Sequence, residues 1–321
     1  MRFSCVLGSL AIALAVRGIA IAAPIYSENF EVDPTANWTV SNGPSDEAHN
    51  LFFDYSTVGI PAAPSGAGTR GLKVQANQSS GVFSGVSLSP TGQSFTGDYK
   101  VLFDWWENFN GPAPVGGSGS TQMSSFGVGT SGTVAQWPGG TQDSIWFGAT
   151  GDGNSSSDWR AYSPTAPGRY ADTAAGIYAA GAVAGSTNAS AAYYASFGTV
   201  TAPAAQTLLF PQQTGVTLVG SAAYEWHQVE IAKTGSIVKW TVDGILIATV
   251  PAGDDTVATG NNIFFGHSDT NATSSTDVND VNLLFSLYDN VRVVPEPSTV
   301  ALCLLGAIGV LASRRRSSTV E

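Results

Sequence analysis

Cysteine is nearly absent from this chain of 321 residues. Its two cysteines, Cys5 and Cys303, lie in the terminal segments, so the body from Pro24 to Val294 has none. That body can form no disulfide, no thiolate metal site and no cysteine nucleophile. Its stability must therefore come from a sizeable hydrophobic core.

Charged residues are also scarce, at 12% of the chain. The body has eight Lys or Arg against 22 Asp or Glu, which gives a formal net charge of −14. So few charges argue against long solvated helices. An acidic body repels phosphate backbones, so nucleic acid is excluded as an expected partner. It is compatible with divalent cations.

The usual signatures of catalysis are missing as well. The histidines His49, His227 and His267 have no metal-ligand spacing, and there is no G-x-S-x-G elbow or phosphate-binding loop. Two carboxylates on one strand face, as glycoside hydrolases use, are also absent. Asp104 and Glu107 could reach a cleft, but we favour a solvated strand end for them. The sequence predicts no catalytic residue and a non-enzymatic protein.

Short apolar runs separated by Gly, Pro, Asn and Asp fill the body, a pattern typical of all-β folds. Glu225 to Val250 predicts a three-stranded meander with a hairpin turn at Asp243-Gly244. Tyr26–Glu31 and Leu283–Val293 are expected to pair as first and last strands. Further strands are expected at Trp38–Val40, Leu51–Tyr55, Gly71–Ala76, Val82–Leu88, Tyr99–Trp106, Met123–Val128, Ser144–Ala149, Ala192–Phe197 and Asn262–Gly266. Ala171–Ala191 is expected to form a surface insertion or a short helix.

The N-terminus has the layout of a secretory signal peptide over residues 1–23. Arg2 is a short basic region, Val6–Val16 is apolar, and Ala20 and Ala22 suit an Ala-x-Ala cleavage site. An N-terminal membrane anchor is the alternative, although the run is short and interrupted by Arg17.

The C-terminus, residues 294–321, combines a Pro-rich segment, an apolar stretch and a basic end. Pro295, Glu296 and Pro297 should be extended and exposed. Thr299–Ala312 predicts a membrane helix, though a brief one. Arg314, Arg315 and Arg316 would halt translocation and stay cytoplasmic, which leaves the body outside.

The V-P-E-P-S segment, the apolar stretch and the three arginines together resemble the PEP-CTERM sorting signal of bacteria. The resemblance implies export, retention by the tail and processing by an exosortase-type enzyme. The partners implied are that enzyme, the export machinery and exopolysaccharide. The expected location is the cell envelope with the body outside the inner membrane, then the outer surface or the medium. An ordinary anchor that is never cleaved is the alternative.

The Trp226–Val250 pattern and the closing segment F-S-L-Y-D-N-V-R-V resemble the concanavalin A-like lectin and glucanase sandwich. The resemblance implies an all-β, antiparallel β-sandwich of the jelly-roll type over residues 24–293. It does not identify a ligand.

A structural calcium ion is the candidate cofactor. Asp152, Asn154, Ser156 and Asp158 place oxygen atoms at alternate positions, which can wrap a hard cation, although an ion-free Ser/Asp loop is the favoured alternative. By resemblance to sugar-binding sandwiches, a second ion could join Glu28 or Glu31 to Asp289. The loop Asp269–Asp280 is a weaker third candidate.

Eight tryptophans are candidates either for the core or for stacking on sugar rings. Trp38, Trp226 and Trp240 are expected in the core. Five others could be exposed: Trp105, Trp106, Trp137, Trp146 and Trp159. Of these, Trp105, Trp106, Trp137 and Trp159 are the candidates for glycan stacking, although packing in the core is the favoured alternative for most of them. The leading hypothesis is a non-enzymatic surface or matrix protein that binds polysaccharide, and the alternative is a glycan-active hydrolase or lyase.

Overall fold

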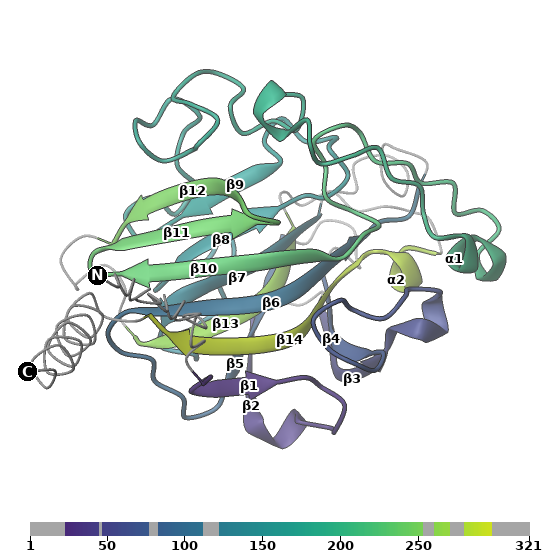
Figure 1. Ribbon diagram of the computed structural model, residues 1–321, viewed down its shortest axis with the longest axis horizontal. Coiled ribbons are helices and arrows are strands. Elements are labelled where there is room, and N and C mark those ends of the chain that lie inside the picture. The colour runs from purple at the N-terminus through teal and green to yellow at the C-terminus, as the bar shows by residue number, and fades with distance from the viewer. Residues whose placement is uncertain are drawn as a thin grey trace, which may run out of the picture.

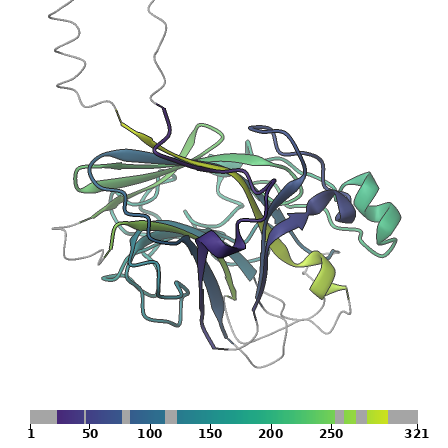
Figure 2. The same ribbon diagram turned by 90° about the horizontal axis from the view of Figure 1, so that it is seen from below.

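The computed structural model describes residues 23–44, 47–76, 83–111, 122–252, 260–269 and 279–296. These residues form two antiparallel sheets that lie face to face in two layers (Figures 1 and 2). The predicted all-β sandwich is therefore confirmed. The predicted signal peptide and the predicted membrane helix at Thr299–Ala312 lie outside the described residues.

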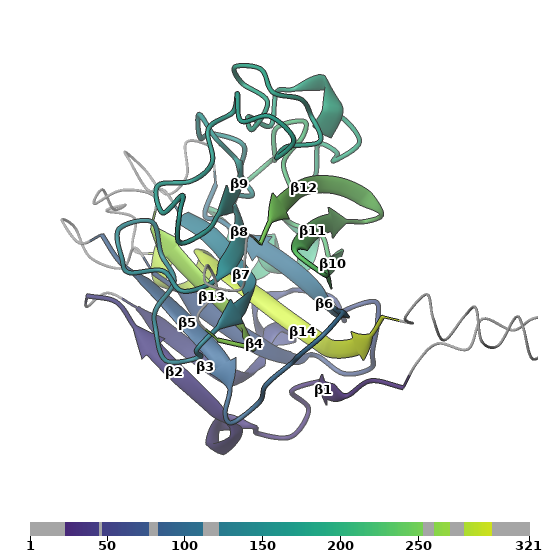
Figure 3. The same ribbon diagram turned by 90° about the vertical axis from the view of Figure 1, so that its left-hand side faces the viewer.

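The larger sheet, sheet A, has eight strands. Seven follow one another across it: β12 (Ile245–Pro251), β11 (Ile237–Val242), β10 (His227–Thr234), β6 (Tyr99–Asn108), β14 (Phe285–Pro295), β4 (Arg70–Gln75) and β3 (Ala48–Asp54). The eighth, β1 (Tyr26–Glu28), pairs with the end of β14. Strands β10 to β12 are the predicted meander, and the β1–β14 pair is the predicted closure of the fold (Figure 3).

The smaller sheet, sheet B, has six strands. In order they are β2 (Trp38–Asn42), β5 (Gly85–Pro90), β13 (Asn262–Asp269), β7 (Gln122–Thr130), β8 (Ile145–Ala149) and β9 (Trp159–Tyr162). The hydrophobic pattern predicted every strand of this sheet except β9.

Helices are few and short in the described part of the chain. They are η1 (Thr35–Asn37), η2 (Tyr55–Val58), η3 (Ala192–Tyr194), α1 (Ala204–Leu209) and α2 (Asp280–Leu283). None of these described helices has the length and apolar character needed to cross a bilayer. The strand predicted at Ala192–Phe197 is wrong: the backbone turns there, with Tyr194 N–H donating to Ala191 O and Phe197 N–H to Tyr194 O.

Aromatic side chains from both sheets fill the space between the layers. The ring of Phe103 on β6 lies 4.9 Å from Phe265 on β13 and 5.1 Å from Phe126 on β7, centroid to centroid. Trp240, as predicted, is fully buried there, whereas Trp146 is fully buried in a separate cluster with Met123, Tyr162 and Phe264. Trp226, also predicted for the core, is only half-buried. Such edge-to-face packing stabilises the sandwich without any disulfide.

Candidate functional site

The outer face of sheet A, turned away from the core, carries side chains in rows that cross the strands. Residues paired on neighbouring antiparallel strands point to the same face, so the register defines each row. One row crosses five strands and consists of Thr241, Glu230, Leu102, Arg292 and Ser27. The rows beside it are Gln228, Asp104 and Asp289 on one side, and Lys239, Ala232, Lys100 and Val294 on the other.

Three adjoining hollows run along this face. One of about 450 Å³ lies over the first row and is lined by Gln228, Thr241 and Arg292, among others. A second, of about 290 Å³ toward β1, shares Ser65 and Arg292 with it. A third, of about 330 Å³ toward the end of β14, shares Glu230. Because neighbouring hollows share lining residues, they form one furrow, called the outer furrow below.

The loop from residue 61 to residue 69 closes one side of the outer furrow. Ser65 donates to Asp104 through its N–H at 2.9 Å and its hydroxyl at 2.7 Å, and Gln228 Nε2 donates to Ser65 Oγ at 3.0 Å. At Gly68 φ is +102°, and a Cβ there would lie 2.0 Å from Glu31 Oε1. Only glycine allows so close an approach in this conformation.

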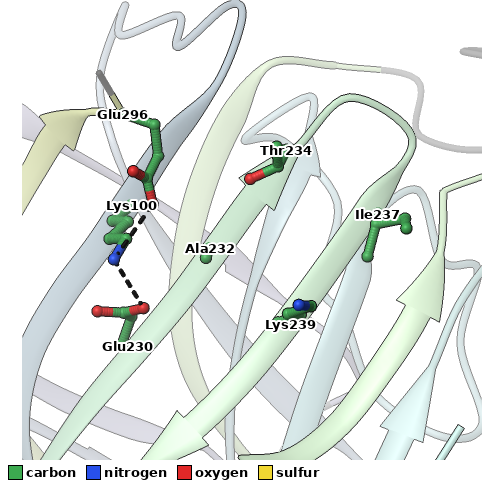
Figure 4. A pocket seen from close by; sticks show the side chains of 7 residues that line it. All are labelled: Lys100, Glu230, Ala232, Thr234, Ile237, Lys239 and Glu296. Carbon is green, nitrogen blue, oxygen red and sulfur yellow. Dashed lines mark ion pairs between the residues drawn. The ribbon is translucent and has the colours of Figure 1, made fainter. Parts of the chain in front are cut away.

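Lys100 lies where the furrow meets the end of β14 (Figure 4). Its Nζ is 3.1 Å from Glu230 Oε1 and 3.1 Å from Glu296 Oε1, so one ammonium bridges two carboxylates. About a third or less of each of these side chains is exposed. The three charges therefore form a small network rather than an isolated surface pair.

Two aspartates lie under the loop beside the furrow. Asp104 and Asp289 pair across β6 and β14, and both are buried. Asn290 Nδ2 donates to Asp104 at 2.8 Å, and the Tyr55 hydroxyl donates to Asp289 at 3.0 Å. Burial raises the pKa of Asp289 to about 7, and the nearby charges of Asp104 and Glu31 also raise it. The prediction that Asp104 ends a strand in solvent is therefore wrong.

At the predicted cation site between the first and last strands, the glutamates accept hydrogen bonds from the backbone. Glu28 Oε1 accepts the N–H of Phe30 at 2.8 Å, and Glu31, not Glu28, is the glutamate whose charge reaches Asp289. Glu31 Oε1 accepts the N–H of Arg70 at 2.9 Å. The carboxylates here are thus engaged by backbone N–H groups.

The four oxygen-bearing residues of the predicted calcium loop differ in burial. Asp152 and Asp158 are buried, whereas Asn154 and Ser156 are exposed. Asp158 Oδ2 accepts the N–H of Ala189 at 2.7 Å, so this aspartate ties two loops together. Burial, together with the nearby Asp158 charge, raises the pKa of Asp152 to about 7. Within the described residues no three His, Cys, Asp or Glu side chains are arranged to hold a metal ion, and calcium binding stays a prediction.

A polar chain crosses the core near the end of β6. Glu107 accepts a hydrogen bond from the Ser124 hydroxyl, Ser124 Oγ lies 2.6 Å from Ser286 Oγ, and Ser286 Oγ lies 2.6 Å from His267 Nδ1. Burial raises the pKa of Glu107 well above its usual range and lowers the pKa of His267 to about 3. Burial therefore favours the uncharged form of both Glu107 and His267, and the chain links both sheets. The solvated strand end predicted for Glu107 is wrong.

Three of the four tryptophans predicted to stack on glycans are buried. Trp105, Trp106 and Trp159 are each at most 1% exposed, so they offer no ring face to a ligand in this structure. Trp137 is partly exposed, but it packs 5.0 Å from Phe83 beside sheet B. The described lining of the outer furrow therefore includes none of the four.

The furrow residues escaped prediction because most of them are ordinary polar residues on strands. The alternation in β10 and β11 places Gln228, Glu230, Lys239 and Thr241 on one face, and that signal was available. No pattern in the sequence indicates that Ser65 and Arg292 complete the same surface. A loop contact and a register shift in β14 bring them there.

The predicted sorting residues lie at the edge of the described chain. Pro295 ends β14 and Glu296 follows it, and both are half-buried. The segment is extended, as predicted, but it is less exposed than predicted because it pairs with β6. Pro297 and Arg314, Arg315 and Arg316 lie outside the described residues.

Residues 293–316 match the PEP-CTERM protein-sorting motif. This motif is a recognition signal for exosortase processing, and it indicates a protein that is exported and sorted to the cell envelope or beyond. No curated protein matches the chain.

Solved structures with a similar arrangement are distant. A protein of unknown function with a galectin-like fold from Bacillus subtilis is 10% identical, with 86% of this chain and 97% of that one covered and a TM-score of 0.42. The Emp47p carbohydrate recognition domain is 10% identical, with coverage of 81% and 89% and a TM-score of 0.39. A Crh5 transglycosylase in complex with NAG is 11% identical, with coverage of 86% and 86% and a TM-score of 0.38.

Proposed function

We propose that this protein is a non-enzymatic envelope protein whose β-sandwich binds a polysaccharide along the outer furrow. The furrow itself is the observation that carries the proposal. It is long, open, and lined by hydroxyl, amide, carboxylate and guanidinium groups on paired strands. A sugar chain presents hydroxyl groups along its length, and rigidly held polar groups can hydrogen-bond them with little loss of side-chain entropy.

Binding is favoured over catalysis by the state of the nearby carboxyl groups. Asp104 and Asp289 pair across two strands, as the two acids of a glycosidase could, but they are only 0% and 3% exposed. Asp104 accepts three hydrogen bonds, from Ser65 and Asn290. Neither carboxyl can reach a glycosidic bond in this arrangement, so the hydrolase alternative would need the loop over them to open.

We propose further that the body lies outside the inner membrane, with the C-terminal arginines inside, and that an exosortase-type enzyme removes the tail. The exported body then reaches the outer surface or the exopolysaccharide layer. Glu296→Gln should leave export and membrane association intact and should prevent loss of the tail. Persistence of the tail in the wild type would contradict the processing step and leave a plain anchor.

Co-sedimentation with exopolysaccharide from the producing cells tests the binding proposal. Arg292→Gln should weaken binding by roughly 10- to 100-fold, since a hydrogen bond to a charged group contributes about 1.5–3 kcal/mol. Arg160→Gln makes the same change of charge on β9 of sheet B and should leave binding unchanged. Equal binding by the wild type and the Arg292 variant would contradict a ligand in the furrow.

A further inference from the structure

The sorting motif begins inside the folded sandwich. Val293, the first matched residue, pairs with Val101 on β6 and with Tyr26 on β1. The pairing continues through Pro295, and the N–H of Glu296 donates to Asp98 O at 3.0 Å. The recognition signal and the last strand of the body therefore share residues.

The side chain of Glu296 is also engaged. Its carboxylate lies 3.1 Å from the ammonium of Lys100, and the side chain is 25% exposed (Figure 4). Lys100 comes from β6, in the middle of sheet A, and Glu230 on β10 holds the same ammonium from the other side. The folded body thus occupies both the backbone and the charge of this motif residue.

We propose that Lys100 restrains tail processing by holding Glu296 on the folded sandwich. The inference rests on the exosortase processing given under Proposed function. An enzyme that recognises the Glu296 carboxylate must supply its own cation or hydrogen-bond donors in place of Lys100. Glu296 must therefore leave Lys100 and Asp98 first, and this release precedes any cleavage of the chain.

The restraint is modest in size. Partly exposed ion pairs contribute little in water, so loss of the Lys100 contact should speed tail loss by roughly two- to fivefold. Glu230 competes with Glu296 for the same ammonium. Removal of the Glu230 carboxylate should therefore strengthen the Lys100–Glu296 pair and slow tail loss. This is the opposite of the effect expected when Lys100 is replaced.

Pulse-labelling of the full chain in its producing cells, with tail loss followed by size, tests the inference. Lys100→Met should lose the tail two- to fivefold faster than the wild type. Lys100→Arg, which keeps the charge, should match the wild type, and Glu230→Gln should be slower. Val86→Ala, a destabilising change in the core of sheet B, should leave the rate unchanged and so serves as the control for general loosening of the fold.

The outcomes separate the two proposals. A wild type that never loses its tail would overturn the processing step, and the restraint with it. A wild type that loses its tail at the same rate as Lys100→Met would overturn only the restraint. Equal acceleration by Lys100→Met and Val86→Ala would also overturn it, because loosening of the whole fold would then explain the rate.

Discussion

Stability should decrease as the pH rises from about 4 to about 7. Burial raises the pKa of Asp152 and of Asp289 from 3.8 to about 7. Between these pH values each carboxyl binds more protons in the folded protein than in the unfolded chain. These two carboxyls therefore lower the free energy of unfolding across this interval, and their effect levels off above it. His267, whose pKa burial lowers from 6.5 to about 3, binds fewer protons in the folded protein and offsets part of this fall.

The size of the effect follows from the same shifts. Three pKa units correspond to about 4 kcal/mol for each carboxyl as an upper limit. A whole domain usually has only about 5–15 kcal/mol of stability, so even half of that loss is measurable. Urea unfolding of the purified protein at pH 5, 6, 7 and 8, followed by tryptophan fluorescence, gives the slope.

A matched pair of variants assigns the slope to a buried carboxyl. Asp289→Asn resembles the protonated side chain, so it should match the wild type near pH 5 and be more stable than the wild type at pH 8. Asp33→Asn alters an exposed carboxyl whose pKa is lowered by hydrogen bonds from Thr35, so the pH slope should not change. A wild-type stability that stays flat or rises between pH 5 and 7 would refute the reasoning, as would an unchanged slope in Asp289→Asn.

Two further predictions concern packing. Gly68→Ala should lower the free energy of unfolding by about 1–3 kcal/mol, because φ is +102° and the new Cβ would meet Glu31. Gly92→Ala, where φ is +70° and the space is open, should lower it by about 1 kcal/mol or less. Equal urea midpoints for the two variants would contradict this. Trp240→Ala should cost about 3–5 kcal/mol, since the ring is fully buried and stacks 5.2 Å from Phe147. Trp137→Ala, at a partly exposed site, should shift the melting temperature much less, and a similar shift for both would contradict the packing.

Much of the fold could be predicted because the strands of the meander alternate apolar and polar residues. That signal is local, and it identified β10, β11 and β12 together with the turn at Asp243-Gly244. Ala192–Phe197 has apolar residues but no partner strand, and Phe197 instead packs 4.9 Å from Trp159. Composition alone does not distinguish an apolar segment that pairs as a strand from one that packs as a loop.

Burial on both sides of one strand was harder to predict. Trp105 and Trp106 are neighbours on β6, so they point to opposite faces. Trp105 packs in the core against Phe126, while Trp106 packs on the other side against Trp226. Trp106 is buried because segments distant in sequence cover the outer side of β6. No local sequence pattern predicts that such segments will pack there. The part of the outer furrow formed by Ser65 and Arg292 escaped prediction for the same reason, because a loop contact and a register shift bring these residues there.

The position of β14 has a mechanical consequence. It is the longest described strand, at 11 residues, and the tail continues directly from its C-terminal end. Hydrogen bonds to β6 and β1 on either side lie across the strand direction. A pull on the tail would load these bonds together, in shear, instead of opening them one by one. If the tail anchors the body and a bound ligand pulls on it, the hydrogen bonds on both sides of β14 would share the force. The attachment would then separate last where β6 and β1 flank the strand.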